Sequence, residues 1–517
     1  MKARSATAAA IATGGVSLAA FLGTAEVVAV ATGPASQPEV ALGRVVIART
    51  PEWLKNFAIS NFGENDKLVL NISVYAALIV LAGLAGALAG RTRTWAALGA
   101  LTALGTVTAV AAATGPSASA WQSLPSVAGA IAGAAVFVSA SARGGRAGRA
   151  GVGADSGPGG SPTLPRRQFL KKAGSLFALS AGAYAVGRGA LARAYNAAAS
   201  RAAVRLPRAV RSTPRVAGTG FEVEGLSPYI TPNKDFYRVD TALVVPQLST
   251  DGYILALHGM VERPAIFTFD DLLHMPLVEA PITMVCVSDP VGGPYVGNAR
   301  WLGVPLAHLL GLVGPRPGAD QLFMTSADGM TIGADLRAAM DGRPALLAVG
   351  MNGEPLPFEH GFPVRAVIPG FYGYASACKW LVDLEVTTYE AKKAYWVQRG
   401  YAQKGAVRLE SRIDTPAPFA QLRAGPVTVA GSAWHPTVGI RKVQVSADGG
   451  PWHEAALADV ESVDTWRLWR WEWEATPGSH SLQVRAVGND GQVQTAAGAP
   501  VFPAGATGRQ SLVVSVT

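Results

Sequence analysis

The chain of 517 residues has only two cysteines, Cys286 and Cys378, and neither lies in a C-x-x-C motif. This scarcity excludes a zinc cluster, an iron–sulfur cluster and a c-type haem site, which need more cysteine ligands or a paired motif. One disulfide remains arithmetically open. We rank it below a free or metal-bound thiol, because a soluble region of roughly 300 residues buries enough core without a cross-link.

Histidine is missing from the first 257 residues, since all seven histidines lie at positions 258, 274, 308, 360, 435, 453 and 480. This absence excludes haem held by two histidines within any N-terminal membrane span. Ionisable residues are also nearly absent from the N-terminal apolar runs, with Glu26 as the main exception. We therefore expect an anchor or a docking surface there, and no proton or ion pathway.

Charged residues are few, at 15% of the chain, yet the net charge is +9. The basic residues cluster at the ends of apolar runs and between positions 188 and 215, and they form no basic stripe with interleaved aromatic residues. Nucleic-acid binding is therefore not expected. Arginines that flank membrane spans account for most of the excess charge.

What the N-terminal region does have is long uncharged runs, at 5–25, 68–90 and 94–142. A bilayer core needs about 20 apolar helical residues, so the third run is long enough for two spans. We predict a turn between them at 114–117 and interfacial anchors at Trp95 and Trp121. Residues 1–142 are thus predicted to form a four-span region, with the short basic loops and both ends in the cytoplasm.

Residues 166–172 read RRQFLKK and open a weakly apolar run, 173–187, after a Gly/Ser/Pro-rich linker at 151–165. This pattern is typical of a twin-arginine signal, which exports a folded protein. We therefore interpret 143–215 as a cytoplasmic linker, the signal, a fifth span and an outer connector. The alternative is a surface-lying helix with a chance arginine pair. Whether the A-x-A-type sequence that ends at Ala194 is cleaved stays open.

The remaining sequence divides into two regions. Residues 216–404 alternate strand-like runs (253–257, 282–286, 364–368) with short helices (270–274, 305–312), which predicts a mixed α+β domain. Residues 405–517 are strand-rich with Gly- and Asp-containing turns, which predicts an immunoglobulin-like sandwich. Its six tryptophans favour core and interface packing over a ligand-binding face: Trp434, Trp452, Trp466, Trp469, Trp471 and Trp473.

Cys286 ends an apolar strand and opens the glycine-rich loop 286–298, CVSDPVGGPYVGN. A cysteine in this place can project a thiolate into a cleft, and a thiolate suits a soft or high-valent metal. A lone cysteine is more often a small buried apolar residue. That interpretation is the one we favour for Cys378.

Four segments in order change the balance for Cys286: FYR at 236–238, ARWLGVPL at 299–306, EHGFPVRAVIPG at 359–370 and KWL at 379–381. With the Cys286 loop, they make the chain from about residue 229 to its C-terminus resemble the sulfite oxidase family of molybdenum enzymes, in its exported bacterial branch. The resemblance implies one molybdenum-molybdopterin, with the metal bound by the pterin dithiolene, oxo or hydroxo groups and Cys286. It also implies that the C-terminal domain is of a dimerising type.

The resemblance also implies roles for other residues. His360 and Arg365 correspond to the pair that grips the pterin phosphate, a role that suits a guanidinium and an imidazole. Lys379 lies near the position of a cofactor-contacting lysine. The further cofactor-binding candidates are Asn233, Arg238 and Ser376.

Substrate recognition departs from the family pattern. Tyr401 corresponds to the active-site tyrosine, but Gly400 replaces the acidic residue before it. Asp289 lies in the loop where an arginine that binds sulfite is expected, and a carboxylate disfavours an anion. Arg300 is the candidate that compensates. Both a sulfite-like and a sulfoxide-like substrate therefore stay open.

These features predict a membrane-anchored molybdopterin-dependent oxidoreductase that transfers an oxygen atom outside the cytoplasm, with Cys286, Tyr401 and Arg300 as catalytic residues. Because the chain lacks haem and cluster ligands, its electrons need a separate carrier, a cytochrome or a quinone-linked protein. Homodimerisation stays open. The alternative is a non-catalytic membrane scaffold that keeps the fold without the metal.

Overall fold

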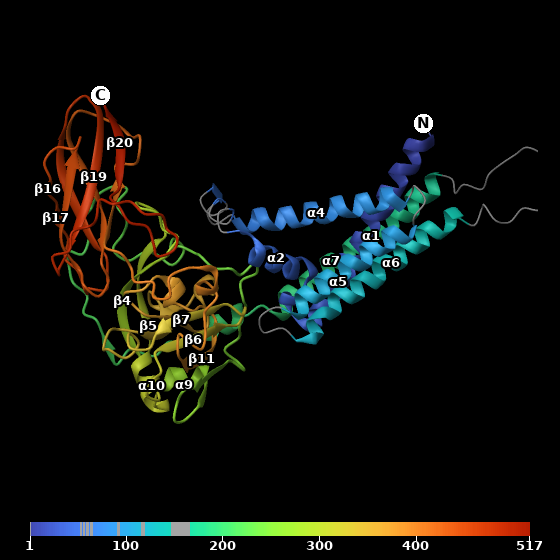
Figure 1. The fold of residues 1–517 in the computed structure, drawn as a ribbon, viewed down its shortest axis with the longest axis horizontal. Helices are drawn as coiled ribbons and strands as arrows, with labels where there is room; N and C mark the ends of the chain where they lie inside the picture. The colour runs from blue at the N-terminus through green and yellow to red at the C-terminus, as the bar shows by residue number, and fades with distance from the viewer. Residues whose placement is uncertain are drawn as a thin grey trace, which may run out of the picture. The chain divides into compact units, whose positions relative to one another are not determined.

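The computed structural model describes residues 2–51, 54, 57, 61–62, 66–89, 94–114, 119–145 and 166–517. The chain forms two compact units (Figure 1). The first comprises Met1–Asn196 with Thr241–Val245, and the second comprises Ala197–Asp240 with Pro246–Thr517. The predicted Gly/Ser/Pro linker lies outside the described residues, as does most of the predicted turn at 114–117.

The first unit is helical. Its helices are α1 (Lys2–Thr32), α2 (Pro38–Arg49), α4 (Asp66–Ala89), α5 (Thr94–Ala113), α6 (Leu124–Gly145) and α7 (Arg166–Ala194), with short 3-10 turns η1 (Pro34–Ser36) and η3 (Ala120–Ser123). α1 packs against α4, α6 and α7. Small residues allow this close approach: a Cβ atom on Gly23 would lie 2.4 Å from the backbone oxygen of Ser180 on α7.

Among the residues that the structure describes in this unit, three stretches are long and apolar enough to cross a membrane: Ala10–Thr32, Lys67–Ala87 and Ala120–Ser139. They correspond to the first, second and fourth predicted spans. The third predicted span is helical, but its apolar stretch, Leu98–Ala113, is shorter. The four-span count therefore remains a prediction. The proposed anchors Trp95 and Trp121 are 85% and 71% exposed.

A buried polar cluster links α1, α2, α4 and α7. Glu26 is 1% exposed, and both of its carboxylate oxygens accept hydrogen bonds from the Gln37 side-chain amide, at 2.7 and 2.8 Å. Arg188 on α7 lies 3.5 Å from both Glu26 and Glu39. Tyr75 donates to Glu39 at 3.1 Å. The arginine of α7 is thus the counter-ion of two buried carboxylates.

The second unit begins with a connector that is fixed to the sheet beside it. It contains α8 (Ala198–Ala203) and β1 (Arg211–Ser212), which pairs in parallel with β4 (Val278–Val285). Arg201 on α8 donates to the backbone oxygens of Leu356 and Pro355 at 2.8 and 2.6 Å. Little of this segment is free to move as a linker.

Two sheets and two short helices form the body of the domain that follows the connector. One sheet has the order β1-β4-β5-β8-β10, with β9 on β8, and the other has the order β3-β2-β11-β6-β7. The further strands are β2 (Ile254–Gly259), β3 (Ala265–Thr268), β5 (Val296–Pro305), β6 (Gln321–Ser326), β7 (Thr331–Asp335), β8 (Leu346–Met351), β9 (Glu354–Pro355), β10 (Arg365–Val367) and β11 (Leu381–Thr387). The helices are α9 (Phe269–His274) and α10 (Leu306–Val313), with 3-10 turns η5 (Phe358–His360), η6 (Gly373–Ala375) and η7 (Val397–Arg399).

The strands and short helices predicted for this domain are confirmed. α9 begins at a capping box, in which the Thr268 hydroxyl accepts from the Asp271 backbone and the Asp271 carboxylate accepts from the Thr268 backbone. Cys286 directly follows β4, as its place after an apolar run predicted. Cys378 is fully buried in the apolar core of this domain, and both cysteines are free thiols.

The C-terminal module consists of two sheets, β12-β14-β18-β17 and β13-β20-β19-β15-β16. The strands are β12 (Glu410–Thr415), β13 (Gln421–Leu422), β14 (Gly425–Trp434), β15 (Ile440–Ala447), β16 (His453–Glu454), β17 (Ala456–Leu457), β18 (Arg467–Ala475), β19 (Gly478–Gly488) and β20 (Ser511–Val516). One apolar cluster joins both sheets. Trp434, Trp466, Trp469 and Trp473 are buried, so the prediction that the tryptophans mostly pack in the core is confirmed.

Candidate functional site around Cys286

Cys286 starts a loop that closes on itself. Its backbone N–H donates to the backbone oxygen of Tyr295 at 2.9 Å, and the Ser288 N–H points at its Sγ at 3.4 Å. Burial raises the pKa of the Cys286 thiol to about 11; the nearby Asp289 adds to the rise, and Lys379 opposes it. The thiol therefore stays protonated unless a metal ion displaces its proton.

Only one of the two carboxylate oxygens of Asp289 has a hydrogen-bond partner among the described residues. Its Oδ1 accepts from the Tyr295 N–H at 2.7 Å and so holds the loop closed, whereas its buried Oδ2 has no hydrogen-bond partner among the described residues. Burial raises the pKa of Asp289 to about 7, although the Tyr295 N–H and Arg412 act in the opposite direction. The same burial raises the pKa of Glu410 to about 9, with Asp289 contributing.

Arg365 is a buried cation on β10. It is 4% exposed, its Nη1 donates to the backbone oxygen of His360 at 3.0 Å, and its Cζ lies 4.9 Å from the centre of the Trp301 ring. Within the part of the chain that the structure describes, no carboxylate forms an ion pair with it. Burial lowers its pKa to about 10. An unpaired buried charge is costly, so this position fits an anionic group such as a phosphate.

Gly361 makes the approach of these cationic residues possible. It adopts φ +107°, and a Cβ atom there would lie 3.1 Å from the Arg365 Cβ and from the Lys379 Cα. A side chain at this position would push Arg365 and the backbone of Lys379 apart. The positive φ and the close packing thus explain why the EHG motif has a glycine at position 361.

The orientation of the His360 ring is set by the backbone of Asn233. His360 Nε2 lies 3.1 Å from the Asn233 carbonyl oxygen, which only accepts, so Nε2 carries the hydrogen. Burial lowers the pKa of His360 to about 4, and Arg365 lowers it further. A bound phosphate would raise this pKa and allow Nδ1 to donate as well.

Lys379 and Arg238 share one carboxylate. Lys379 Nζ lies 2.6 Å from Asp240 Oδ2 and donates to the Glu359 backbone oxygen at 3.1 Å. Arg238 Nε lies 2.9 Å from the same Asp240 oxygen. Next to Lys379, Trp380 has a left-handed backbone (φ +49°) and donates from its indole to the Phe358 backbone oxygen at 2.8 Å. The two predicted cofactor contacts are thus held together by a residue that the sequence analysis did not single out.

Tyr237 connects the thiol to the buried guanidinium. Its pKa is raised by burial and then by the nearby Cys286, while Arg365 opposes the rise. Tyr237 therefore lies close to both. The only sequence signal for Tyr237 is its place in the FYR segment, beside the candidate Arg238.

Asn233 and Ser376 lie near the cluster with their side chains already committed. The Asn233 amide donates to Glu354 Oε1 at 2.6 Å and to the Met351 backbone oxygen at 3.3 Å. The Ser376 hydroxyl shares its hydrogen between the backbone oxygens of Phe371 and Tyr372, at 3.1 and 3.0 Å. Both side chains shape the backbone of the site, and their predicted contact with the cofactor remains a prediction.

Tyr401 is buried among aromatic rings. Its ring centre lies 5.6 Å from that of Tyr374, 5.3 Å from that of Trp396 and 5.1 Å from that of Phe502. It belongs to the same apolar cluster as Val285 and Val287, the two neighbours of Cys286. Tyr401 thus packs with the side chains on either side of Cys286, and its catalytic role remains a prediction.

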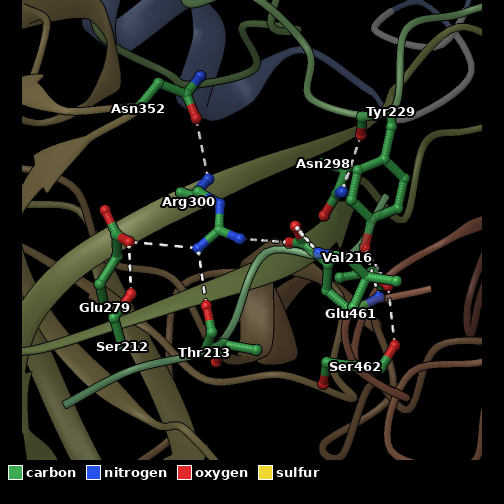
Figure 2. Close-up of polar contacts among 11 residues, drawn as sticks. Ser212, Thr213, Val216, Tyr229, Glu279, Asn298, Arg300, Asn352, Glu461 and Ser462 are labelled. Atoms are coloured by element: carbon green, nitrogen blue, oxygen red, sulfur yellow. Dashed lines mark hydrogen bonds and ion pairs between the residues drawn. The ribbon is translucent and has the colours of Figure 1, made fainter. Parts of the chain in front are cut away.

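Arg300 is not brought to this cluster, and here the expectation needs correction: Figure 2 shows its guanidinium between Glu279 and Glu461. It pairs across the sheet with Pro281, five residues before Cys286, which corresponds to roughly 17 Å along β4. Its guanidinium lies 2.6 Å from Glu461 Oε2 and 3.2 Å from Glu279 Oε2. With two acidic partners at this distance, Arg300 cannot offset Asp289 beside the thiol.

The described residues contain no group of three or more His, Cys, Asp or Glu side chains arranged to hold a metal ion. A metal at Cys286 must therefore take most of its ligands from a cofactor. The donor set fits such a cofactor: one thiol for the metal and one unpaired buried arginine, with a histidine, for an anionic tail.

Comparison with known proteins finds a matching domain family and similar proteins. Residues 242–396 match the family described as oxidoreductase molybdopterin binding domain. Mouse (Mus musculus) mitochondrial sulfite oxidase is 31% identical over 327 residues, and the match covers 53% of this chain and 59% of that protein. An NADH nitrate reductase from Cichorium intybus is 32% identical over 194 residues, covering 32% of this chain and 21% of that protein.

Among solved structures, the sulfane dehydrogenase SoxCD from Paracoccus pantotrophus is 28% identical, with a TM-score of 0.47, and covers 52% of this chain and 75% of that chain. The match with the mammalian sulfite oxidases spans 59% of their length, which is under two thirds. Residues 242–396 are a molybdopterin-binding oxidoreductase domain of the sulfite oxidase and nitrate reductase type, whose cofactor is molybdenum-molybdopterin.

Proposed function

We propose that the protein is a membrane-anchored, molybdopterin-dependent oxidoreductase that transfers an oxygen atom at a molybdenum bound by Cys286. The family match and the free buried thiol after β4 support this proposal. Three helices of sufficient length and hydropathy support the anchor. The RRQFLKK segment at the start of α7 supports export, with the catalytic domain on the extracytoplasmic side.

The observation that carries the proposal is the unpaired buried charge of Arg365. In this proposal Arg365 and His360 hold the phosphate of the cofactor. Lys379 and Arg238, held by Asp240, complete the cationic wall, and Cys286 is the protein ligand of the metal. The bound cofactor supplies two-electron oxygen-atom transfer, while the protein fixes its orientation and electrostatic surroundings.

The surroundings of Asp289 bear on the substrate. Asp289 lies in the Cys286 loop, and its buried Oδ2 has no hydrogen-bond partner among the described residues. Arg300 forms ion pairs with Glu461 and Glu279 instead. Arg412 contacts this loop by donating to the Gly293 backbone oxygen at 2.8 Å, but its Nε is already paired with Asp414 Oδ1 at 2.6 Å. This arrangement favours an uncharged, sulfoxide-like substrate over an anionic, sulfite-like one.

We further propose that a separate cytochrome or quinone-linked carrier exchanges electrons with the site, because all histidines follow position 257 and the two cysteines form no cluster motif. The two-sheet C-terminal module is proposed to be immunoglobulin-like. Homodimerisation through it is the arrangement that the family resemblance favours.

The decisive experiment is metal analysis of the purified full-length protein. About one molybdenum per chain is expected, and none would support the scaffold alternative. The C286A variant should fold and lose activity. A screen with viologen or cytochrome mediators against sulfite and sulfoxides then identifies the substrate; faster turnover of sulfite would contradict our reading of Asp289.

A further inference from the structure

A series of hydrogen bonds runs from the C-terminal module to the proposed phosphate site, and Figure 2 shows its first part, from Glu461 through Arg300 to Asn352. It begins at Glu461, whose Oε2 lies 2.6 Å from Arg300 Nη2. Both side chains are buried, at 5% and 4% exposure, so each depends on the other for charge compensation. The Glu461 backbone N–H in turn donates to the Tyr229 hydroxyl at 3.1 Å.

The next link is Asn352, in the two-residue turn between β8 and β9. Its backbone is left-handed (φ +53°), as an Asn-Gly turn between paired strands requires. Its Oδ1 accepts from the Arg300 backbone N–H at 2.9 Å. Its Nδ2 donates to the Thr231 backbone oxygen at 2.9 Å and to Asn233 Oδ1 at 2.8 Å. Both amide hydrogens are used, so the side chain has one orientation.

The last link reaches the cofactor site. Asn233, held by Asn352, offers its backbone carbonyl to His360 Nε2 at 3.1 Å. The direction of this bond decides which ring nitrogen of His360 carries the hydrogen in the neutral ring. We call Glu461, Arg300, Asn352 and Asn233 the Asn352 network.

We propose that Asn352 is a positioning residue of the cofactor site, which holds the Asn233 carbonyl where it fixes the His360 ring, and that Glu461 anchors the network through Arg300. This inference rests on the proposed function. Loss of a group that hydrogen-bonds to a ligand-binding residue and fixes its orientation typically lowers the affinity for the bound group about 10- to 100-fold.

The test compares two glycine substitutions in full-length protein. N352G removes the side chain and leaves a residue that prefers φ > 0, so the turn itself is not strained. F419G is the matched control, because Phe419 also has a positive φ (+62°) and its side chain is 78% exposed on the C-terminal module. Molybdenum and pterin per chain, thermal midpoint and pterin release against pH are measured for both variants and for wild type.

N352G should retain a thermal midpoint close to that of F419G, with occupancy lower by about tenfold. As the pH is raised, N352G should also begin to release its pterin at a lower pH than wild type does, because His360 loses its proton earlier. The Asn233 carbonyl raises the pKa of His360, whereas Arg365, Lys379 and Arg238 lower it, so weakening the carbonyl contact shifts the pKa down. A change in general stability alone would leave this pH dependence in place.

Wild-type occupancy and pH dependence in N352G would overturn the inference. Should N352G fail to fold, N352D decides: it keeps the acceptor for Arg300 but lacks the Nδ2 donor, and unchanged occupancy would again overturn it. Wild-type protein without molybdenum would instead contradict the proposed function itself.

Discussion

At the scale of single residues, the cationic cluster is assembled for an anion that the protein chain does not supply. Arg365 contacts the backbone oxygens of His360 and Ala366 and the Trp301 ring. Gly361 packs between Arg365 and Lys379, another cation of the same cluster. A binding site of this kind trades stability of the empty protein for affinity.

Replacing Arg365 should therefore separate stability from binding. R365M is expected to stabilise the cofactor-free protein by about 1–4 kcal/mol, because an apolar side chain of similar length removes an uncompensated charge. The same variant should lose molybdopterin. Differential scanning fluorimetry and pterin analysis measure the two effects. R343M is the control, since Arg343 already pairs with Asp341 at 2.7 Å; a destabilised, cofactor-free R365M would contradict the prediction.

Glu410 predicts a pH dependence of stability. Burial raises its pKa from 4.5 to about 9, so the folded chain binds this proton more tightly than the unfolded chain. Raising the pH from about 4.5 to about 9 therefore progressively favours unfolding. E410Q should remove this decline, with a higher thermal midpoint than wild type at alkaline pH and little difference at acidic pH. E472Q, on the exposed face of β18, should follow wild type; equal slopes in E410Q and wild type would refute the assignment.

Sequence order made Cys286, His360 and Arg365 candidates because each belongs to a local motif with its own chemistry. It did not reveal Asp240, which meets Lys379 from 139 residues away, or the partners of Arg300, which come from β4 and from the C-terminal module. Pairings of this kind depend on topology, and no local pattern encodes them.

At the scale of elements, regular patterns predicted β2, β4, β10, α9 and α10, since each is a short apolar or capped run with clear boundaries. α2 was missed because it lies between predicted spans in a segment of mixed polarity. It begins with Pro38 at N1 and Glu39 in the first turn, both typical of a helix start, and Glu39 is then buried against Arg188.

The contact of α7 with the other helices is also testable. R188A should destabilise the helical unit by roughly 2 kcal/mol, because it leaves Glu26 and Glu39 buried without their counter-ion, while the half-exposed arginine moderates the loss. R193A, on the same helix and exposed, is the control. Thermal unfolding in detergent measures both; equal midpoints would show that the ion pairs contribute nothing.

At the scale of the whole molecule, the predicted boundary between residues 404 and 405 separates two domains that pack as one. A single apolar cluster contains Val285, Val287 and Tyr401 on one side and Trp434, Trp466 and Leu468 on the other. Trp466 also donates from its indole to the Tyr229 backbone oxygen at 2.8 Å. The end of the strand that carries Cys286 is thus covered by the C-terminal module.

Truncation after residue 404 should therefore disrupt the catalytic domain. The shortened chain would expose Val285, Val287 and Tyr401 and leave Arg300 without Glu461, so we expect aggregation and loss of the cofactor. Size-exclusion chromatography and molybdenum analysis measure this. A monomeric, molybdenum-loaded truncated protein would show that the two domains are energetically independent.

The fixed connector leaves only a short tether between the helical unit and the second unit. Only 195–197 separate the end of α7 from α8, and the segment after α8 is bound to the adjacent sheet. Whatever the orientation of the two units, four peptide steps reach about 14 Å at most. With the proposed topology, these few residues tether the second unit to the anchor, and hydrolysis near Ala194 would release it to diffuse.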